Sequence, residues 1–102
     1  GPTSGQVRLE LQADCYAGVF FDNTVRSSDS PIEAVTADDL KRIADAASAV
    51  GDDHIQTQQG GRVVPESWTH GSSAMRQHWV EQGFTSGDPR SCNTLDTDDL
   101  GG

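Results

Sequence analysis

The sequence has few basic residues, and this shortage excludes two classes of partner. Seven Lys and Arg residues stand against sixteen Asp and Glu residues, so the formal net charge at pH 7 is −9. Nucleic-acid phosphates require a basic patch on the protein that binds them, and anionic membrane surfaces attract polybasic segments. We therefore expect no nucleic-acid partner and no binding to anionic membranes.

Long apolar runs are also missing. A transmembrane helix needs roughly 20 consecutive, predominantly apolar residues, and no stretch of this sequence approaches that length. We therefore expect no transmembrane segment in this chain. Its 102 residues suffice for one small domain, and only 33% of them are hydrophobic. The core must be modest, and such a domain is marginally stable without a cross-link or a partner.

Cysteine is scarce, because the chain contains only Cys15 and Cys92, which lie far apart in the sequence. This separation excludes a zinc ribbon or a thioredoxin-like motif, both of which need closely paired cysteines. A disulfide between the two would tie the first predicted helix to the C-terminal end of the chain. Two buried free thiols are the alternative, and the residues alone leave both open.

No complete catalytic motif is present in the sequence. The three histidines, at positions 54, 70 and 78, form no His-Glu-x-x-His motif, and there is no Gly-x-Ser-x-Gly elbow or phosphate-binding loop. A catalytic zinc site needs three protein ligands in addition to water, and no such set can be assembled from this chain. His70 stands out among the histidines only because it lies on a loop at the start of a predicted helix.

Apolar residues recur at helical spacing through most of the chain. The pattern predicts helices over residues 7–24, over residues 36–50 with Thr36 as N-cap, and from Thr69 or Ser72 to residue 82, with Gly83 ending the last helix in a left-handed conformation. We therefore predict an all-α fold, a small bundle of three to four helices with long polar loops.

The two ends of the chain differ in composition from the helical part. Residues 1–6 are rich in Gly, Pro and Ser, and residues 96–102 are acidic and end in Gly-Gly. Composition of this kind is typical of disordered termini. We expect a flexible N-terminal segment over residues 1–6, a helical part over residues 7–95 and a disordered acidic tail over residues 96–102.

Glu10 and Asp14 lie one turn apart on the same face of the first predicted helix. This helix is apolar on nearly every side, which is typical of a buried helix, and carboxylates there need a partner because an uncompensated buried charge is costly. The pair has the spacing of half a zinc site, in which one carboxylate binds the metal and the other orients a metal-bound histidine. The alternatives are pairing with Arg62 or Arg76, or a partly exposed helix face.

Five stretches together resemble a known family. They are Val-Arg-Leu-Glu-Leu-Gln-Ala-Asp-Cys-Tyr-Ala-Gly-Val at 7–19, Ala-Asp-Ala-Ala-Ser-Ala-Val-Gly-Asp-Asp at 44–53, Arg-Val-Val-Pro at 62–65, Thr-His-Gly-Ser-Ser at 69–73 and Gly-Phe-x-Ser-Gly-Asp-Pro-x-x-Cys at 83–92. In this order they resemble the C-terminal portion of the bacterial neutral zinc metallopeptidase family, which is gluzincin-like. The motifs run along nearly the whole chain.

The resemblance assigns roles to particular residues. In that family an upstream His-Glu-x-x-His helix supplies two zinc-binding histidines and a glutamate general base. Glu10 matches the third zinc ligand and Asp14 the carboxylate that orients a metal-bound histidine, while His70 is a candidate hydrogen-bond donor to the transition state. Cys15 and Cys92 match family cysteines, which implies a disulfide between them. The implied reaction is attack of a zinc-activated water on a peptide carbonyl.

The chain departs from the family because it contains no His-Glu-x-x-His motif. We therefore expect the C-terminal fragment of a zinc metallopeptidase, inactive alone and binding no zinc by itself. Its expected partners are the missing N-terminal metal-binding segment of the same protein and, in the complete enzyme, a peptide or protein substrate. The alternative function is a non-catalytic extracytoplasmic helical domain that binds a partner.

The resemblance also implies a location. Family members typically carry an N-terminal membrane anchor, with the rest of the protein outside the cytoplasm. We therefore expect an extracytoplasmic location, on the periplasmic or cell-envelope side, for a parent protein anchored by an N-terminal membrane helix. A disulfide would persist in such a compartment.

Overall fold

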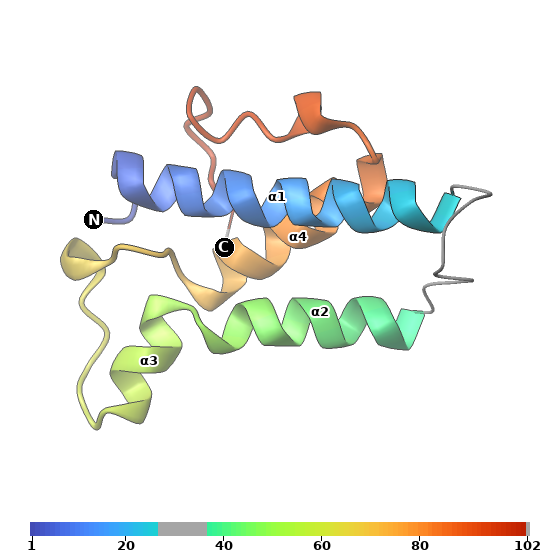
Figure 1. Ribbon diagram of the computed structural model, residues 1–102. Helices are drawn as coiled ribbons and strands as arrows, with labels where there is room; N and C mark the ends of the chain where they lie inside the picture. Colours follow the sequence, from blue (N-terminus) through green and yellow to red (C-terminus); the bar gives the residue numbers. More distant parts are fainter. Residues whose placement is uncertain (27–36, 102) are drawn as a thin grey trace.

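The computed structural model describes residues 1–26 and 37–101, and over these ranges the chain is helical with no β-strand. The elements in order are α1 (Gly5–Arg26), α2 (Ala37–Ala49), α3 (Asp52–Gln58), η1 (Pro65–Ser67), α4 (Ser73–Ser86) and η2 (Pro89–Ser91), as Figure 1 shows. The predicted all-α class is confirmed.

Helix α4 is the central element, because it packs against both α1 and α2. The chain then continues through η2 and runs back along α1 (Figure 1). A single cluster of buried side chains joins these elements, and it consists of Val7, Leu11, Cys15, Val19, Trp68, Trp79, Cys92 and Leu100. The core therefore lies between one side of α1, α4 and the C-terminal segment.

Only one side of α1 is buried, although its sequence is apolar on nearly every side. Val7, Leu11 and the following residues at i+4 spacing form the buried side. On the opposite side, Leu9, Tyr16 and Phe20 are 58%, 45% and 65% exposed. The prediction of a helix buried all round is wrong for this chain, because α4 and the C-terminal segment pack on one side of the helix.

Gly83 does not end α4, because the helix continues past it and Gly87, at φ 61°, provides the left-handed C-cap. Gly83 instead lies where α4 crosses α1, and a β-carbon there would collide with the backbone carbonyl of Cys15. Gly18 on α1 is equally close to the backbone of α4. Both glycines therefore allow the two helix backbones to approach closely.

Ser72 is the N-cap of α4, since its hydroxyl accepts a hydrogen bond from the backbone N–H of Met75 at 3.1 Å. Of the two predicted caps, Ser72 and not Thr69 therefore begins the helix. Helix α1 begins at Gly5 and extends to Arg26, somewhat beyond the predicted range at both ends. The predicted cap Thr36 lies outside the described residues.

The two termini are bound to the fold where flexible segments were predicted. The amino group of Gly1 donates to the Trp68 carbonyl at 3.0 Å. Leu100, in the segment predicted to be a disordered tail, is 3% exposed, and its carbonyl accepts a hydrogen bond from the Trp79 indole at 2.8 Å. The segment returns to the core because Leu100 supplies apolar surface that the modest core otherwise lacks.

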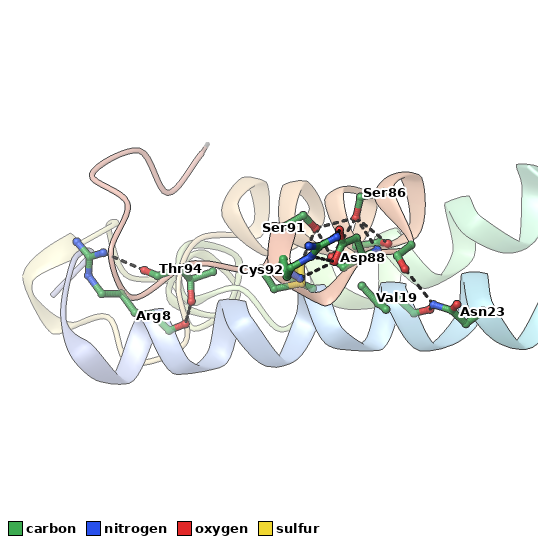
Figure 2. Close-up of a disulfide and its surroundings, with 12 residues drawn as sticks. Arg8, Val19, Asn23, Ser86, Asp88, Ser91, Cys92 and Thr94 are labelled. Atoms are coloured by element: carbon green, nitrogen blue, oxygen red, sulfur yellow. Dashed lines mark hydrogen bonds and ion pairs between the residues drawn. A yellow bond between two sulfur atoms is a disulfide. The ribbon is translucent and has the colours of Figure 1, made fainter.

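A disulfide joins Cys15 of α1 to Cys92 at the end of η2, with their Cα atoms 5.5 Å apart, so this prediction is confirmed. Figure 2 shows how the segment beyond Cys92 lies along α1. The Thr94 hydroxyl donates to the Arg8 carbonyl at 2.6 Å, and the Arg8 guanidinium donates to the Thr94 carbonyl at 2.9 Å. These bonds and the disulfide fix the C-terminal segment on α1.

Candidate functional site

Asp14 lies on the buried side of α1 and is held by Arg76 of α4. The Nε and Nη2 atoms of Arg76 donate to the two carboxylate oxygens at 2.8 Å each, and both side chains are nearly buried. This charge-assisted, bidentate pair joins the two helices. Of the alternatives that the sequence left open for Asp14, pairing with Arg76 is the one that the structure shows.

Glu10 lies one turn earlier on α1, nearer the surface. Its side chain is 38% exposed, and its Oε2 is 3.9 Å from the Arg76 Nη2, which is beyond hydrogen-bonding distance. Arg76 therefore compensates the charge of Glu10 without occupying its oxygens. The carboxylate remains accessible from solvent.

Arg76 remains a cation under all ordinary conditions. Its hydrogen bonds to Asp14 raise its pKa above the usual value, against the opposing effect of burial, and the negative charges of Asp14, Glu10 and Asp52 raise it further. Asp14 is hydrogen-bonded to the guanidinium, and Glu10 lies 3.9 Å from it. This arrangement removes the repulsion that Glu10 and Asp14 would otherwise exert on each other along the helix.

Asp52, the first residue of α3, is a buried carboxylate that the sequence analysis did not single out. Its Oδ2 accepts backbone N–H bonds from Thr69, His70 and Gly71 at 2.9, 2.7 and 2.9 Å. Burial alone would raise the pKa of Asp52, but these bonds and the His70 side chain lower it below the usual value. Its one signal in the sequence is that it and Asp53 are acidic residues in the first turn of a helix, where negative charge is favourable.

His70 lies on the loop that Asp52 holds, and its side chain is 45% exposed. Its Nδ1 is 2.9 Å from the Thr69 hydroxyl and 3.3 Å from Asp52 Oδ1. The next residue, Gly71, is so close to α1 that a β-carbon on it would lie 3.3 Å from Leu11. The loop therefore lies against the first turns of α1, the part of the helix that carries Glu10.

The other two histidines do not join this site. Both are exposed, His54 on α3 and His78 on α4, and the His78 ring makes an edge contact with Trp79. Among the residues that the structure describes, no three His, Cys, Asp or Glu side chains are grouped so that they could hold a metal ion. Glu10 is therefore not grouped with further metal-ligating side chains among the described residues.

A shallow surface hollow occurs elsewhere, between α1 and the segment that follows α4. It is lined by Gln12, Tyr16, Pro89, Arg90, Cys92 and Asn93. It contains neither Glu10 nor His70, so it does not belong to the candidate site. In the described part of the chain, no helix is both long enough and apolar enough to span a membrane.

Comparison with known proteins identifies relatives over almost the whole chain. The family model described as "Putative neutral zinc metallopeptidase" matches residues 3–95. Uncharacterized proteins of Mycobacterium tuberculosis and Mycobacterium bovis are each 46% identical to the chain, covering 99% of it and 36% of the relative. The uncharacterized protein YpfJ of Escherichia coli is 48% identical, covering 87% of the chain and 29% of the relative. The chain thus spans about a third of the length of these relatives. No solved structure matches it.

Proposed function

Because the chain belongs to the neutral zinc metallopeptidase family, we propose that it is the C-terminal part of a zinc peptidase and supplies the third zinc ligand, Glu10. The other two ligands and the general base would come from a His-Glu-x-x-His segment elsewhere in the same protein. The observation that carries this proposal concerns the Glu10 carboxylate. It is accessible from solvent, and Arg76 compensates its negative charge without forming a hydrogen bond to its oxygens.

Asp14 is suited to orient a histidine that binds the same zinc. Its two oxygens offer about four lone-pair positions, and Arg76 uses two of them. A remaining position can accept the free ring N–H of a zinc-bound histidine, the usual partner of such a group. Because Arg76 holds the carboxylate rigidly, this acceptor would already be in place when the histidine arrives.

The exposed side of α1 is an apolar surface on which the proposed metal-binding segment would pack. Leu9, Tyr16 and Phe20 are large apolar side chains on one side of the helix and are exposed to solvent, and Ala13, also exposed, lies on the turn between Leu9 and Tyr16. A metal-binding segment packed on this side would bury the apolar row and bring its histidines next to Glu10. The relatives, about three times as long as this chain, have room for such a segment.

The proposed reaction is hydrolysis of peptide bonds in a peptide or protein substrate. The zinc, when bound, would supply a water of lowered pKa and polarise the substrate carbonyl. Glu10 would hold the metal, Asp14 would orient its histidine ligand, and His70 would donate a hydrogen bond to the developing oxyanion. Because the sequence of this chain contains no His-Glu-x-x-His motif, we expect the chain to be inactive alone.

We also propose an extracytoplasmic location for the parent protein, anchored by an N-terminal membrane helix. The Cys15–Cys92 disulfide supports the oxidising side of the membrane. The exposed apolar row of α1 is equally compatible with a second function, a non-catalytic extracytoplasmic domain that binds a partner. Zinc content and activity of the complete protein distinguish the two functions.

The test uses the complete product of the gene that encodes this chain. Bound zinc is measured by mass spectrometry, and peptidase activity is measured on a mixture of unstructured peptides. Glu10→Gln should lose zinc and reduce activity more than about 100-fold, and Asp14→Asn should reduce activity about 10- to 100-fold. Glu81→Gln, on an exposed position of α4, is the matched control. A zinc-free complete protein, or full activity in Glu10→Gln, would contradict the proposal.

A further inference from the structure

Residues 61–64, between α3 and η1, form an exposed segment without helix or turn. Val64 has backbone angles of φ −127° and ψ 90°, an extended conformation that the following proline favours, and Val63 is 46% exposed. We propose that this segment is a substrate subsite that binds the backbone of an extended peptide several residues from the scissile bond. This inference rests on the proposed peptidase function, because it names how that site would hold its substrate.

The Gln56 side chain of α3 binds one edge of this segment as a neighbouring strand would. Its Oε1 accepts the Val64 N–H at 2.9 Å and its Nε2 donates to the Val64 carbonyl at 3.3 Å, which resembles the two bonds between opposed residues of antiparallel strands. Nε2 also donates to the Ser67 hydroxyl at 2.8 Å, and Oε1 also accepts from the Trp68 indole at 3.2 Å. All hydrogen-bonding positions of the carboxamide are therefore used, and they fix the segment in place.

The opposite edge of the segment is open to solvent. The described part of the chain has no cis peptide bond, and in a trans peptide the C=O and the N–H point in opposite directions. Because the Val64 N–H points at Gln56, the Val63 C=O points away from it. Neither backbone group of Val63 has a hydrogen-bonding partner within residues 1–26 and 37–101. Val63 thus offers the unpaired backbone groups to which an extended peptide can add as a strand.

Helix α3 holds this segment and the His70 loop from adjacent turns on one face. Asp52 binds the backbone of residues 69–71, and Gln56, four residues later, binds Val64. Four helical residues advance about 6 Å, which is about two residues of an extended peptide. A peptide whose scissile carbonyl lies at His70 could therefore place a residue about two to four positions from that bond beside Val63.

The segment also indicates the kind of residue that it would accept. A substrate residue opposite Val63 would have its side chain on the same face as the Val63 side chain. β-branched and aromatic side chains pack well in such cross-strand pairs. The subsite would therefore hold the peptide mainly by its backbone and prefer an apolar residue at this one position.

The first experiment measures amide hydrogen exchange in this chain with the probe peptide acetyl-Thr-Val-Lys-Val-Thr-amide. Exchange of the Val63 N–H should slow about tenfold at a peptide concentration about ten times the dissociation constant. The Val64 N–H, already bonded to Gln56, is the internal control and should not change. The same peptide N-methylated at its three central residues, which blocks both of its edges, should have no effect. No slowing with the unmethylated peptide up to its solubility limit, or equal slowing with both peptides, would overturn the proposal.

Val63→Pro tests the backbone donor directly, because proline has no N–H. Peptide-induced chemical-shift changes should show binding weakened about fivefold, the usual effect of one lost hydrogen bond. Val63→Ala keeps the N–H and is the matched control, with an expected change of less than about twofold. Slow exchange of the Val64 N–H in both variants shows that the bonds to Gln56 are intact. If Val63→Pro disturbs them, the comparison of the two peptides decides the question.

The second experiment measures kcat/KM in the complete protein with peptides of two lengths. Val63→Pro should lower kcat/KM about fivefold for peptides of about ten residues. It should have no effect on substrates with a single residue on each side of the scissile bond, because these cannot reach the segment. An equal loss for both lengths would show that Val63 acts through the fold and would overturn the proposal. So would an unchanged kcat/KM for the long peptides.

A strand from the rest of the protein is the alternative occupant of this edge. It would protect the Val63 N–H in the complete protein before any peptide is added, and that result would overturn the assignment to substrate.

Glu10→Gln separates failure of this inference from failure of the proposed function. If Glu10→Gln abolishes activity and Val63→Pro cleaves long peptides as well as wild type, the peptidase function stands and the subsite is wrong. If Glu10→Gln keeps full activity, the proposed function is wrong. The exchange measurement on this chain then still decides whether residues 61–64 bind an extended peptide.

Discussion

Arg76 and Asp14 form a bidentate ion pair across the interface of α4 and α1, with both N–O distances at 2.8 Å. The pair lies at about the level of Glu10, whose charge Arg76 also compensates. It therefore has two effects, since it joins the two main helices and it allows two acidic residues to share one face of α1. Glu10, the proposed zinc ligand, can therefore lie beside Asp14 on this helix without strong repulsion, because the cation is already present.

Removing only one partner of this ion pair should destabilise the fold. Asp14→Ala leaves Arg76 nearly buried without its hydrogen-bonded carboxylate, and we expect a loss of about 3 kcal/mol in the free energy of unfolding, measured by urea denaturation. The double variant Asp14→Ala with Arg76→Met should recover most of it, because no buried charge remains unpaired and the Glu10 side chain is 38% exposed. Lys41→Ala, which breaks the exposed Lys41–Asp45 pair, should leave the urea midpoint unchanged. Equal stability of Asp14→Ala and wild type would show that the pair is not formed in solution.

Gly83→Ala should also destabilise the protein. The added β-carbon would overlap the backbone of Cys15, and neither backbone can move without separating α1 from α4. Overpacking of this kind costs up to about 3 kcal/mol, and the better helix propensity of Ala returns about 1 kcal/mol, so we expect a net loss of about 2 kcal/mol. Gly5→Ala is the control, because nothing lies within 4 Å of its β-carbon position. If both variants are equally stable, the close helix crossing is wrong.

Removal of the disulfide should have the largest effect on stability. The bridge closes a loop between residues 77 positions apart, and the loop-entropy relation gives about 4 kcal/mol for such a loop. We expect the double variant Cys15→Ser with Cys92→Ser to lose about that much in urea denaturation, which leaves a small domain close to unfolding. Thiol titration of the unfolded, non-reduced wild type should find no free thiols, and two free thiols would contradict the bridge.

The helical class and the start of α4 could be predicted because both depend on local sequence. Apolar spacing indicates helices, and Ser72 is a good N-cap wherever a helix follows it. The disulfide followed from a resemblance and not from the two cysteines themselves. The prediction that Gly83 ends the last helix was wrong. A glycine within a helical pattern can either end the helix or allow a neighbouring backbone to approach closely, and the local sequence does not distinguish the two.

The features that sequence reasoning missed depend on contacts between distant segments. Leu100 stands among acidic and glycine residues, so only the structure reveals that it packs in the core. Asp52 binds the backbone of a loop that begins 17 residues later, and no local pattern encodes such a contact. The exposed side of α1 could not be distinguished from the buried side because both carry apolar residues.

Stability should depend on pH through Asp52. Its pKa is lowered in the folded state, below the usual value of about 3.9, so its ionised form stabilises the fold. This contribution is fully present above the unfolded-state pKa and is lost as the pH falls through the folded-state pKa. We expect Asp52→Asn to cost about 1 to 2 kcal/mol at pH 7 and the difference from wild type to shrink below about pH 4. A difference that stays constant down to about pH 2.5, well below the usual Asp pKa, would exclude this role.

Zinc binding by this chain alone should not depend on Glu10. A single accessible carboxylate is not a site, because zinc needs three or four protein ligands to displace its waters, and the described residues group no others around Glu10. We therefore expect titration calorimetry to give the same weak binding for wild type and Glu10→Ala. A micromolar affinity that is lost in Glu10→Ala would show that this chain completes a site by itself, for example between two copies. In the complete protein the same substitution should abolish zinc binding, because there Glu10 would be one of three ligands fixed in place before the metal binds.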